Sequence, residues 1–306
     1  MLFEVKILGS CSATPVYNRH PSAQLLNIDQ HFYLIDCGES TQFQLNRYKV
    51  KFNKIDHVFI THLHGDHYLG LIGLISSMHL HGRIKDLHLY GPPGLDEIII
   101  VQMRYSETFL KYKINFHELN TEKRETIIDT SMLTVETIPL QHRIKCCGFL
   151  FREKPKKRRI NKEMLPANIL LQEIAKLKSG EDIFNEDGSL KYKNEAVTLP
   201  PKKSRSFAYC TDTIYTESFL HQITGIDLLY HESTFLKDLT LRAKETYHST
   251  AEEAATIALK AGVEKLIIGH FSSRYKDLQP LLSEARETFP NTFLAIEGDT
   301  FSIPEE

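Results

Sequence analysis

The sequence THLHGDH at positions 61–67 holds the side chains best suited to chemistry in this chain. Side chains alternate along an extended strand, so His62 and His64 point to the same side. A glycine then permits a sharp bend, after which Asp66 and His67 can face a second, nearby point. Imidazole nitrogens and carboxylate oxygens are ligands for zinc, manganese or iron. The segment therefore predicts a metal site that water can reach.

Further candidate ligands stand where other apolar stretches give way to loops, namely His142, Asp212 and His270. Four neighbouring side chains cannot fill two metal sites, so we expect these distant residues to complete them, with Asp212 as a bridging carboxylate. Two metals about 3.5–4 Å apart lower the pKa of a bound water toward ~7 and stabilise negative charge, which favours hydrolysis. Asp36 also ends a predicted strand, and we expect it to orient a ligand.

A hydrolase of this kind also needs a proton donor for its leaving group. His248 is the leading candidate, because it directly precedes a predicted helix start at Ser249 and Thr250. Glu232 could hold the His248 imidazole in the useful tautomer and raise its basicity. A surface histidine beside a helix gives the same local pattern, so the residues alone leave this role open.

Short apolar, β-branched segments separated by turn residues predict strands, and helical spacing of apolar residues predicts helices. The predicted strands are 3–8, 32–36, 57–61, 87–90, 133–138, 148–151, 207–210, 228–231, 265–269 and 292–296. The predicted helices are 68–80, 94–105, 250–261 and 280–288. Two strand-rich halves that each carry helices indicate an α/β protein in which sheets pack face to face with helices outside.

Composition excludes several classes of protein. A chain of 306 residues with 42% hydrophobic and 25% charged residues has the balance of a globular protein, not of a disordered segment, collagen or coiled coil. No apolar run approaches the ~18 residues of a membrane helix, so we expect no membrane partner. The first residues lack a signal-peptide pattern, and five scattered cysteines do not form a disulfide framework. These features favour a cytoplasmic protein.

Residues 152–205, which we call the arm, differ from the rest of the chain. They carry 14 Lys and Arg against 8 Asp and Glu, whereas the whole chain has a net charge of −2. The densest cluster, KPKKRR, stands at 154–159, and the amphipathic stretch 169–177 is followed by a turn-rich tract. A basic insertion that projects from an acidic body is typical of a segment that binds a polyanion. A solvated loop is the simpler alternative.

The motif H-x-H-x-D-H after a strand, followed by His142, Asp212 and His270, resembles the metallo-β-lactamase superfamily. The sequences HEST at 231–234 and HST at 248–250 look like the HEAT and HST loops of the short form of ribonuclease Z, a family of tRNA 3′-processing endoribonucleases. The resemblance runs from Phe3 to about Ile303, with the motifs in order.

This resemblance implies a single metallo-β-lactamase-like αββα sandwich over 1–306, with 152–205 as an inserted flexible arm. It implies a cytoplasmic homodimer with two Zn²⁺ per subunit that removes the 3′ trailer from precursor tRNA by phosphodiester hydrolysis. The products would be a tRNA with a 3′-hydroxyl and a trailer with a 5′-phosphate.

The resemblance also assigns roles to residues. The implied ligands are His62, His64 and His142 for one metal, and Asp66, His67 and His270 for the other, with Asp212 bridging. The implied catalytic residues are Asp66, which also helps to position the attacking hydroxide, His248, which protonates the departing ribose 3′-oxygen, and Glu232. The implied substrate-binding residues are Arg19 and the arm residues Lys156, Lys157, Arg158 and Arg159.

Two parts of the sequence depart from the family pattern. The loop 15–20 stands where the family has P-x-K-x-R-N: Arg19 matches, but Tyr17 and His20 do not. The arm lacks the Gly-Pro element of many short forms, and the segment 166–168 is its only distant counterpart.

Two other functions remain open at this point. One is a hydrolase of the same fold that acts on a small ester, thioester, lactone or sulfate. The other is a non-catalytic, zinc-containing RNA-binding protein. The basic arm and the paired HEST and HST loops argue against the first, and the complete set of candidate ligands together with His248 argues against the second.

Overall fold

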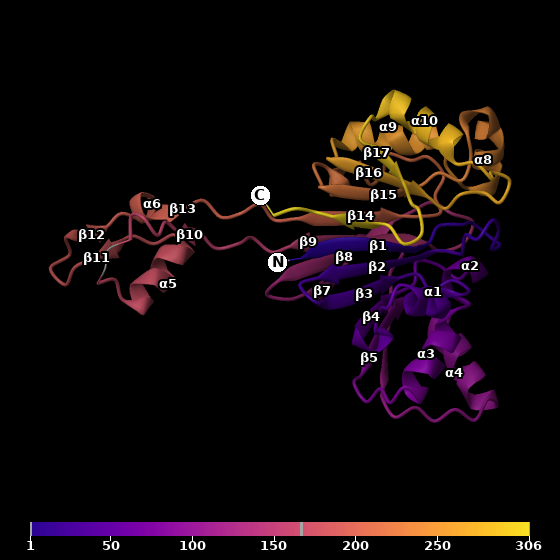
Figure 1. The fold of residues 1–306 in the computed structure, drawn as a ribbon, viewed down its shortest axis with the longest axis horizontal. Helices are drawn as coiled ribbons and strands as arrows, with labels where there is room; N and C mark the ends of the chain where they lie inside the picture. Colours follow the sequence, from indigo (N-terminus) through magenta and orange to yellow (C-terminus); the bar gives the residue numbers. More distant parts are fainter. Residues whose placement is uncertain (1, 166–167, 306) are drawn as a thin grey trace.

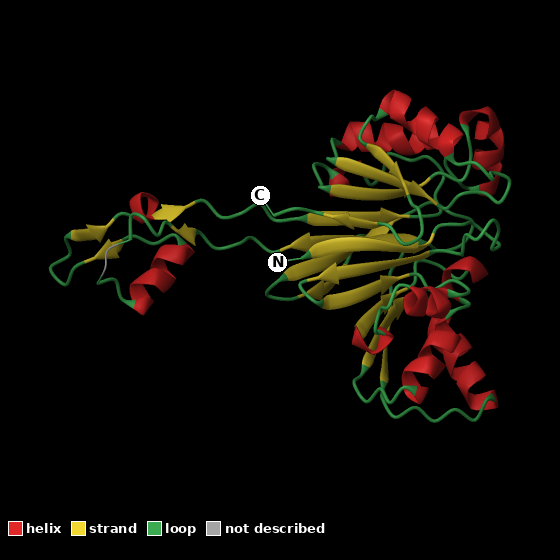
Figure 2. Ribbon diagram, viewed as in Figure 1, coloured by secondary structure: helices red, strands yellow, loops and turns green. Residues whose placement is uncertain are grey.

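Two mixed sheets pack face to face in the computed structural model, which describes residues 2–165 and 168–305 (Figures 1 and 2). Each sheet has seven strands within the described residues. The first sheet has the order β18 (Thr300–Ser302), β1 (Phe3–Gly9), β2 (Ala23–Ile28), β3 (His31–Ile35), β4 (Ile55–Phe59), β5 (Leu87–Gly91) and β6 (Ile114–Glu118). The second has the order β17 (Thr292–Leu294), β16 (Lys265–Gly269), β15 (Leu228–Glu232), β14 (Ser206–Cys210), β9 (Cys147–Glu153), β8 (Leu133–Pro139) and β7 (Thr126–Asp129).

Helices cover the outer face of each sheet, which confirms the α/β sandwich with helices outside. The first sheet carries α1 (Thr41–Arg47), α2 (Gly65–Tyr68), α3 (Leu71–Leu80) and α4 (Leu95–Tyr105). The second carries α7 (Leu220–Ile223), α8 (Thr240–Thr246), α9 (Ala251–Ala261) and α10 (Gln279–Thr288). Short 3-10 turns occupy Phe52–Lys54 and Lys237–Leu239. None of the described helices is long and apolar enough to cross a bilayer.

The same change of strand direction occurs in both sheets. The pairings β1–β2–β3 are antiparallel and β3–β4–β5–β6 parallel, while β8–β9–β14 are antiparallel and β14–β15–β16 parallel. Loops that leave the carboxyl ends of parallel strands meet at one edge, which is where open α/β sheets form their sites. The candidate residues after β4, β14 and β16 are therefore brought to one edge of the sandwich.

Separate apolar clusters hold the layers together. Aromatic side chains fill the space between the sheets: the Phe59 ring on β4 lies 5.2 Å from the Phe149 ring and 5.5 Å from the Phe151 ring, both on β9. A second cluster joins the first sheet to its helices and includes Val58 of β4 and Leu74 of α3, both fully buried. The strands that carry the site residues are therefore packed on both faces. Because protein interiors are close-packed, these strands resist displacement.

The predicted helix 68–80 is wrong at its start, because the structure breaks it into α2 and α3. Gly70 lies in the break, where its N–H donates to the Cys37 carbonyl at 2.9 Å. A Cβ on Gly70 would lie 2.1 Å from the Gly38 carbonyl oxygen, so only glycine permits this approach. The break holds the loop 36–38 against α2.

The arm leaves the sandwich after β9, forms a small folded unit and returns into β14 (Figure 1). Its elements are β10 (Arg159–Ile160), α5 (Leu171–Ser179), β11 (Ile183–Phe184), β12 (Leu190–Tyr192), α6 (Asn194–Val197) and β13 (Thr198–Leu199). A core of its own contains Leu177, Ile183 and Val197. The turn-rich tract after α5 thus includes a short hairpin, and the expected counterpart of the Gly-Pro element at 166–168 falls largely outside the described residues.

Helix α9 begins with a capping box at Thr250, within the helix start that the sequence predicts. The Thr250 hydroxyl accepts a hydrogen bond from the Glu253 N–H at 3.2 Å, and the Glu253 carboxylate accepts one from the Thr250 N–H at 2.8 Å. We expect Thr250→Ala to lower the free energy of unfolding by about 1 kcal/mol, measured by denaturant titration, because it leaves an N-terminal N–H without its partner.

Thr256→Ala is the matched control, since it makes the same chemical change in the middle of α9. Alanine has the higher helix propensity, so this variant should be neutral or slightly more stable. Equal destabilisation by both substitutions would contradict the capping role of Thr250.

Candidate metal centre

Asp36 holds the start of the metal-binding motif in place. The Thr61 N–H donates to Asp36 Oδ1 at 2.9 Å and the Thr61 hydroxyl donates to the same oxygen at 3.0 Å. The other carboxylate oxygen, Oδ2, lies 2.7 Å from His67 Nδ1. Asp36 is fully buried and therefore joins both ends of the 61–67 segment, which is the supporting role expected for it.

The structure brings all seven predicted ligands together at one end of the sandwich. One group contains His62, His64, His142 and Asp212, and a second contains Asp66, His67 and His270, with the ligand atoms of each group within 4.8 Å of one another. These residues come from the loops after β4, β8, β14 and β16 and from α2. Residues up to 208 positions apart in the sequence thus form one continuous cluster.

Asp212, a member of the first group, also reaches the second group. Each of its two carboxylate oxygens faces the histidines of one group. Its Oδ2 is 3.6 Å from His62 Nε2 and 3.7 Å from His142 Nε2. Its Oδ1 is 3.4 Å from His67 Nε2 and 3.1 Å from His270 Nε2. This is the geometry expected of a carboxylate that bridges two cations.

Hydrogen bonds at the outer ring nitrogens fix the orientation of several histidines. His142 Nδ1 donates to the Tyr247 carbonyl at 3.0 Å, and His270 Nδ1 lies 3.0 Å from the Thr234 hydroxyl. With His67 Nδ1 held by Asp36, the Nε2 atom of each of these rings faces the cluster. Such outer contacts set the tautomer that a metal ligand needs.

The donor set fits a divalent cation. His67 Nε2 is buried and has no hydrogen-bond partner among the described residues, an arrangement that is costly unless the atom binds something else. The Nδ1 atom of His64 lies 3.1 Å from Nε2 of both His62 and His142, so three nitrogens converge. Neutral imidazoles and ionised carboxylates are the protonation states that bind such a cation.

The carboxylates around His67 also favour positive charge within the ligand cluster. Burial alone would lower the pKa of His67, but three carboxylates outweigh it and raise this pKa well above its ordinary value. Burial would raise the pKa of Asp212, yet the neighbouring His270 and His67 hold it well below its ordinary value. Burial and the neighbouring His67 lower the pKa of His62. These neighbours thus keep the Asp212 carboxylate ionised.

His248 lies at the edge of the cluster with Glu232 behind it. Its Nδ1 is 2.9 Å from Glu232 Oε1 and 4.0 Å from Asp212 Oδ2. Burial would lower the pKa of His248, but the Glu232 carboxylate outweighs it and raises this pKa to about 9. Glu232 is fully buried and also accepts hydrogen bonds from the Thr213 N–H and from the N–H and hydroxyl of Thr234. The second nitrogen, Nε2, is left to donate a proton.

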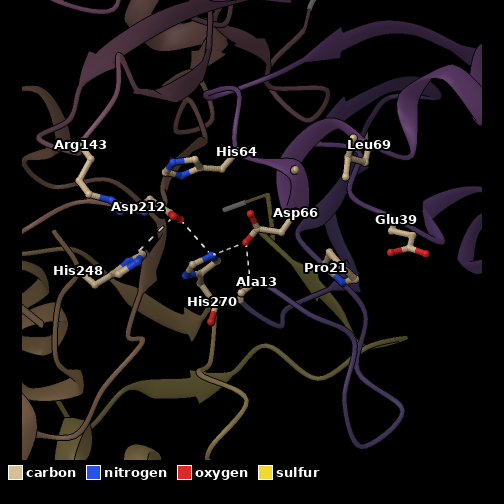
Figure 3. A pocket seen from close by; sticks show the side chains of 12 residues that line it. Ala13, Pro21, Glu39, His64, Asp66, Leu69, Arg143, Asp212, His248 and His270 are labelled. Carbon is tan, nitrogen blue, oxygen red and sulfur yellow. Dashed lines mark hydrogen bonds and ion pairs between the residues drawn. The ribbon is translucent and has the colours of Figure 1, made fainter. Parts of the chain in front are cut away.

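An open cavity of about 340 Å³ gives access to this cluster. Figure 3 shows His64, Asp66, Asp212, His248 and His270 converging on it. The Ala13 N–H donates to Asp66 Oδ2 at 2.8 Å, so the loop after β1 contacts the site. A cavity of this shape can admit a phosphodiester group but does not enclose a whole macromolecule.

Sequence reasoning missed two residues at this site. Arg143 directly follows His142 and lines the cavity, where it can meet a negatively charged group. Thr234 contacts Glu232, His270 and, at 3.4 Å, His248 Nδ1, so its hydroxyl joins the metal cluster to the candidate proton donor. The position of Thr234 in the HEST sequence was the signal that could have revealed it.

The predicted substrate-binding residues lie away from this cavity. Arg19 donates to the Tyr275 carbonyl at 2.5 Å and lines a separate cavity of about 210 Å³. On the arm, Lys157 and Arg159 are exposed, whereas the Arg158 guanidinium donates to the Thr198 hydroxyl at 2.8 Å. Lys156 forms ion pairs with Glu153 and Glu305. The basic cluster is thus partly engaged with the protein itself.

Known proteins resemble this chain over its whole length. It is 52% identical over 305 residues to "Ribonuclease Z" of Cytophaga hutchinsonii, covering 100% of this chain and 97% of that protein. It is 44% identical over 302 residues to "Ribonuclease Z" of Bacteroides fragilis, covering 98% and 99%. A family model described as Anti-Pycsar protein Apyc1 matches residues 3–165, so the chain also belongs to that set of sequences.

Solved structures agree with these relatives. Human tRNase Z, short form, has a TM-score of 0.72 and 26% identity and covers 98% of this chain and 99% of its own. The metallo-β-lactamase fold protein YhfI from Bacillus subtilis has a TM-score of 0.69 at 19% identity, over 99% of this chain and 100% of its own. On these likenesses, and with the motifs of that family gathered at one site, the chain belongs to the ribonuclease Z family and has the metallo-β-lactamase fold.

Proposed function

We propose that this chain is a metal-dependent endoribonuclease that removes the 3′ trailer from precursor tRNA. The observation that carries the proposal is the convergence of seven metal-binding side chains with His248 at one open cavity, in a chain whose full-length relatives are named Ribonuclease Z. Cleavage would leave a 3′-hydroxyl on the tRNA and a 5′-phosphate on the trailer.

The cofactor we propose is a pair of Zn²⁺ ions per subunit. The family implies a divalent metal, and the cluster offers enough donors for two ions. His62, His64 and His142 would hold one ion, and Asp66, His67 and His270 the other, with Asp212 shared. When bound, such a pair would acidify a water and stabilise negative charge on the oxygens of the attacked phosphate.

The chain's own residues would carry the other steps. Asp66, held by the Ala13 N–H, would orient the attacking water, and Arg143 would contact the scissile phosphate. His248 would give its Nε2 proton to the departing ribose 3′-oxygen. Glu232, at 2.9 Å from Nδ1, would keep that imidazole charged and correctly oriented.

The arm would hold the tRNA far from the cut, as an insertion within a single domain that spans 1–306. Lys157 and Arg159 are exposed there and would neutralise phosphates together with Arg158. Arg19 would contact the RNA near the cavity. We also propose a cytoplasmic homodimer, in which the arm of one subunit reaches the tRNA bound by the other.

Two observations weigh against the alternative functions. A hydrolase of small esters, thioesters, lactones or sulfates does not need the arm, and the full-length relatives extend through the arm while the Apyc1 model ends inside it at residue 165. A non-catalytic RNA-binding protein does not need His248 paired with the buried Glu232. Incubation with a precursor tRNA and mapping of the cut tests the proposal: no cleavage with zinc bound would reject it.

His67→Ala tests the ligand assignment. The substitution removes a nitrogen from one metal site and leaves three carboxylates without their neighbour, so we expect loss of at least one metal ion and of nearly all cleavage. Elemental analysis of the purified protein measures the metal, and the exposed His31→Ala is the control. Retention of both metal and activity would show that His67 is not a ligand.

His248→Ala tests the proton donor. Because His248 lies at the edge of the cluster, we expect the variant to keep its metal while the single-turnover cleavage rate falls by ~10²–10⁴. His221→Ala, an exposed histidine on α7, makes the same chemical change elsewhere. An unchanged rate in His248→Ala would exclude the donor role.

Replacement of residues 154–200 by a short Gly-Ser linker tests the arm, because it removes the basic cluster at 154–159. The arm has its own core, so the sandwich should fold without it. We expect at least about tenfold weaker binding of precursor tRNA and a shallower dependence of binding on salt, because phosphate contacts are lost. Hydrolysis of a small phosphodiester should not change. Equal tRNA affinity at every salt concentration would argue against an RNA-binding arm.

A further inference from the structure

The two connections between the arm and the sandwich do not pair with each other as strands. Among the described residues, no backbone hydrogen bond joins 155–157 to 200–202. Prolines explain this, because Pro155, Pro200 and Pro201 have no N–H to donate. Something other than a β-ladder must therefore keep the two connections together where the arm begins.

Glu305, near the C-terminus, supplies a link between them. Its Oε1 lies 2.8 Å from Lys156 Nζ on the outgoing connection, and its Oε2 lies 3.0 Å from Lys202 Nζ on the returning one. Figure 1 shows the C-terminus beside both connections. The two ammonium groups lower the pKa of Glu305 to about 2, so this carboxylate is ionised at neutral pH.

The segment that carries Glu305 is itself fixed to the sandwich. The Ile303 N–H donates to the Phe3 carbonyl at 2.9 Å, and the Ile303 carbonyl accepts from Arg205 Nη1 at 3.1 Å. Arg205 in turn pairs with Glu153, at 2.6 Å between Nη2 and Oε1, at the end of β9. Glu305 therefore links both connections to the C-terminal segment. That segment contacts Phe3 of the first sheet and, through Arg205, Glu153 of the second sheet.

We propose that Glu305 is a positioning residue that braces the base of the arm and so sets the direction in which the arm presents its basic residues to tRNA. This rests on the proposed function, because it assumes that the arm binds tRNA. The arm projects well beyond the sandwich on two narrow connections, so a small change of angle at its base moves its far end by much more. Lys156 then serves the brace rather than a phosphate.

If Glu305 acted only through its charge, neutralising it would have the opposite effect on RNA binding, so the two explanations can be told apart by experiment. Glu305 is an acid among basic residues of a polyanion-binding surface, so neutralising it would strengthen RNA binding if its charge were all that mattered. The substitution would also remove this acidic partner of Lys202 and leave Lys156 paired with Glu153 alone among the described residues, which favours phosphate binding on charge grounds. Only a positioning role makes the loss of a negative charge weaken the binding of RNA.

The experiment compares Glu305→Gln with Glu186→Gln in the full-length, zinc-loaded protein. Glu186 is an exposed arm residue, so its substitution makes the same change in charge away from the brace. We expect Glu305→Gln to raise KM for precursor tRNA about three- to tenfold, the scale of one or two exposed ion pairs. Its kcat and its hydrolysis of a small phosphodiester should not change. An unchanged or lower KM would overturn the proposal.

A second measurement tests the brace without RNA. All five cysteines are buried, so new cysteines at the exposed positions Leu190 on the arm and Leu259 on α9 can carry spin labels. We expect Glu305→Gln to broaden the distribution of distances between the labels, and Glu186→Gln to leave it unchanged. The same narrow distribution in all three proteins would overturn the brace. If wild-type protein does not cleave tRNA but Glu305→Gln broadens the distribution, the proposed function fails and the brace stands.

Discussion

The site depends on an electrostatic constraint: carboxylates are buried beside one another and need positive charge between them. Asp36 and Asp212 are almost completely buried, and Asp66 is close by with 11% of its side chain exposed. Buried charges are costly unless they are paired or bind a metal. Histidines surround these carboxylates, and His67 in their midst has a raised pKa. A metal cation can replace the proton that the raised pKa favours on His67. The same cation would then both stabilise the buried carboxylates and supply the chemistry of the site.

The topology of the sheets makes this concentration of charge possible. Each sheet changes from antiparallel to parallel pairing, and β4, β14, β15 and β16 all end at the same edge. Each ligand-bearing loop therefore starts from a strand that is packed on both faces. The strands make the site rigid. Because the site residues lie in the loops, they can be polar, unlike the apolar residues that fill the core. Precise placement of this kind is what metal-assisted hydrolysis requires.

The sequence predicted the chemistry of the site better than the details of the fold. The ligand motif was visible because His62, His64, Asp66 and His67 are neighbours and because the remaining candidates each follow an apolar strand. Strand β2 was missed, since it is buried on both faces and shows no alternation of polar and apolar residues. The break at Gly70 was missed because it results from contact with Gly38, which is distant in sequence. Contacts such as that of Thr234 with both His248 and His270 appear only when the loops are brought together.

The separate core of the arm has a consequence for how such an enzyme changes over evolutionary time. Leu177, Ile183 and Val197 pack on one another and not on the sandwich, and two proline-containing connections join the parts. Insertions, deletions or exchange of the unit at the far end therefore need not disturb the packing around the metal centre. Natural selection can therefore alter this unit while the residues of the metal centre are inherited intact.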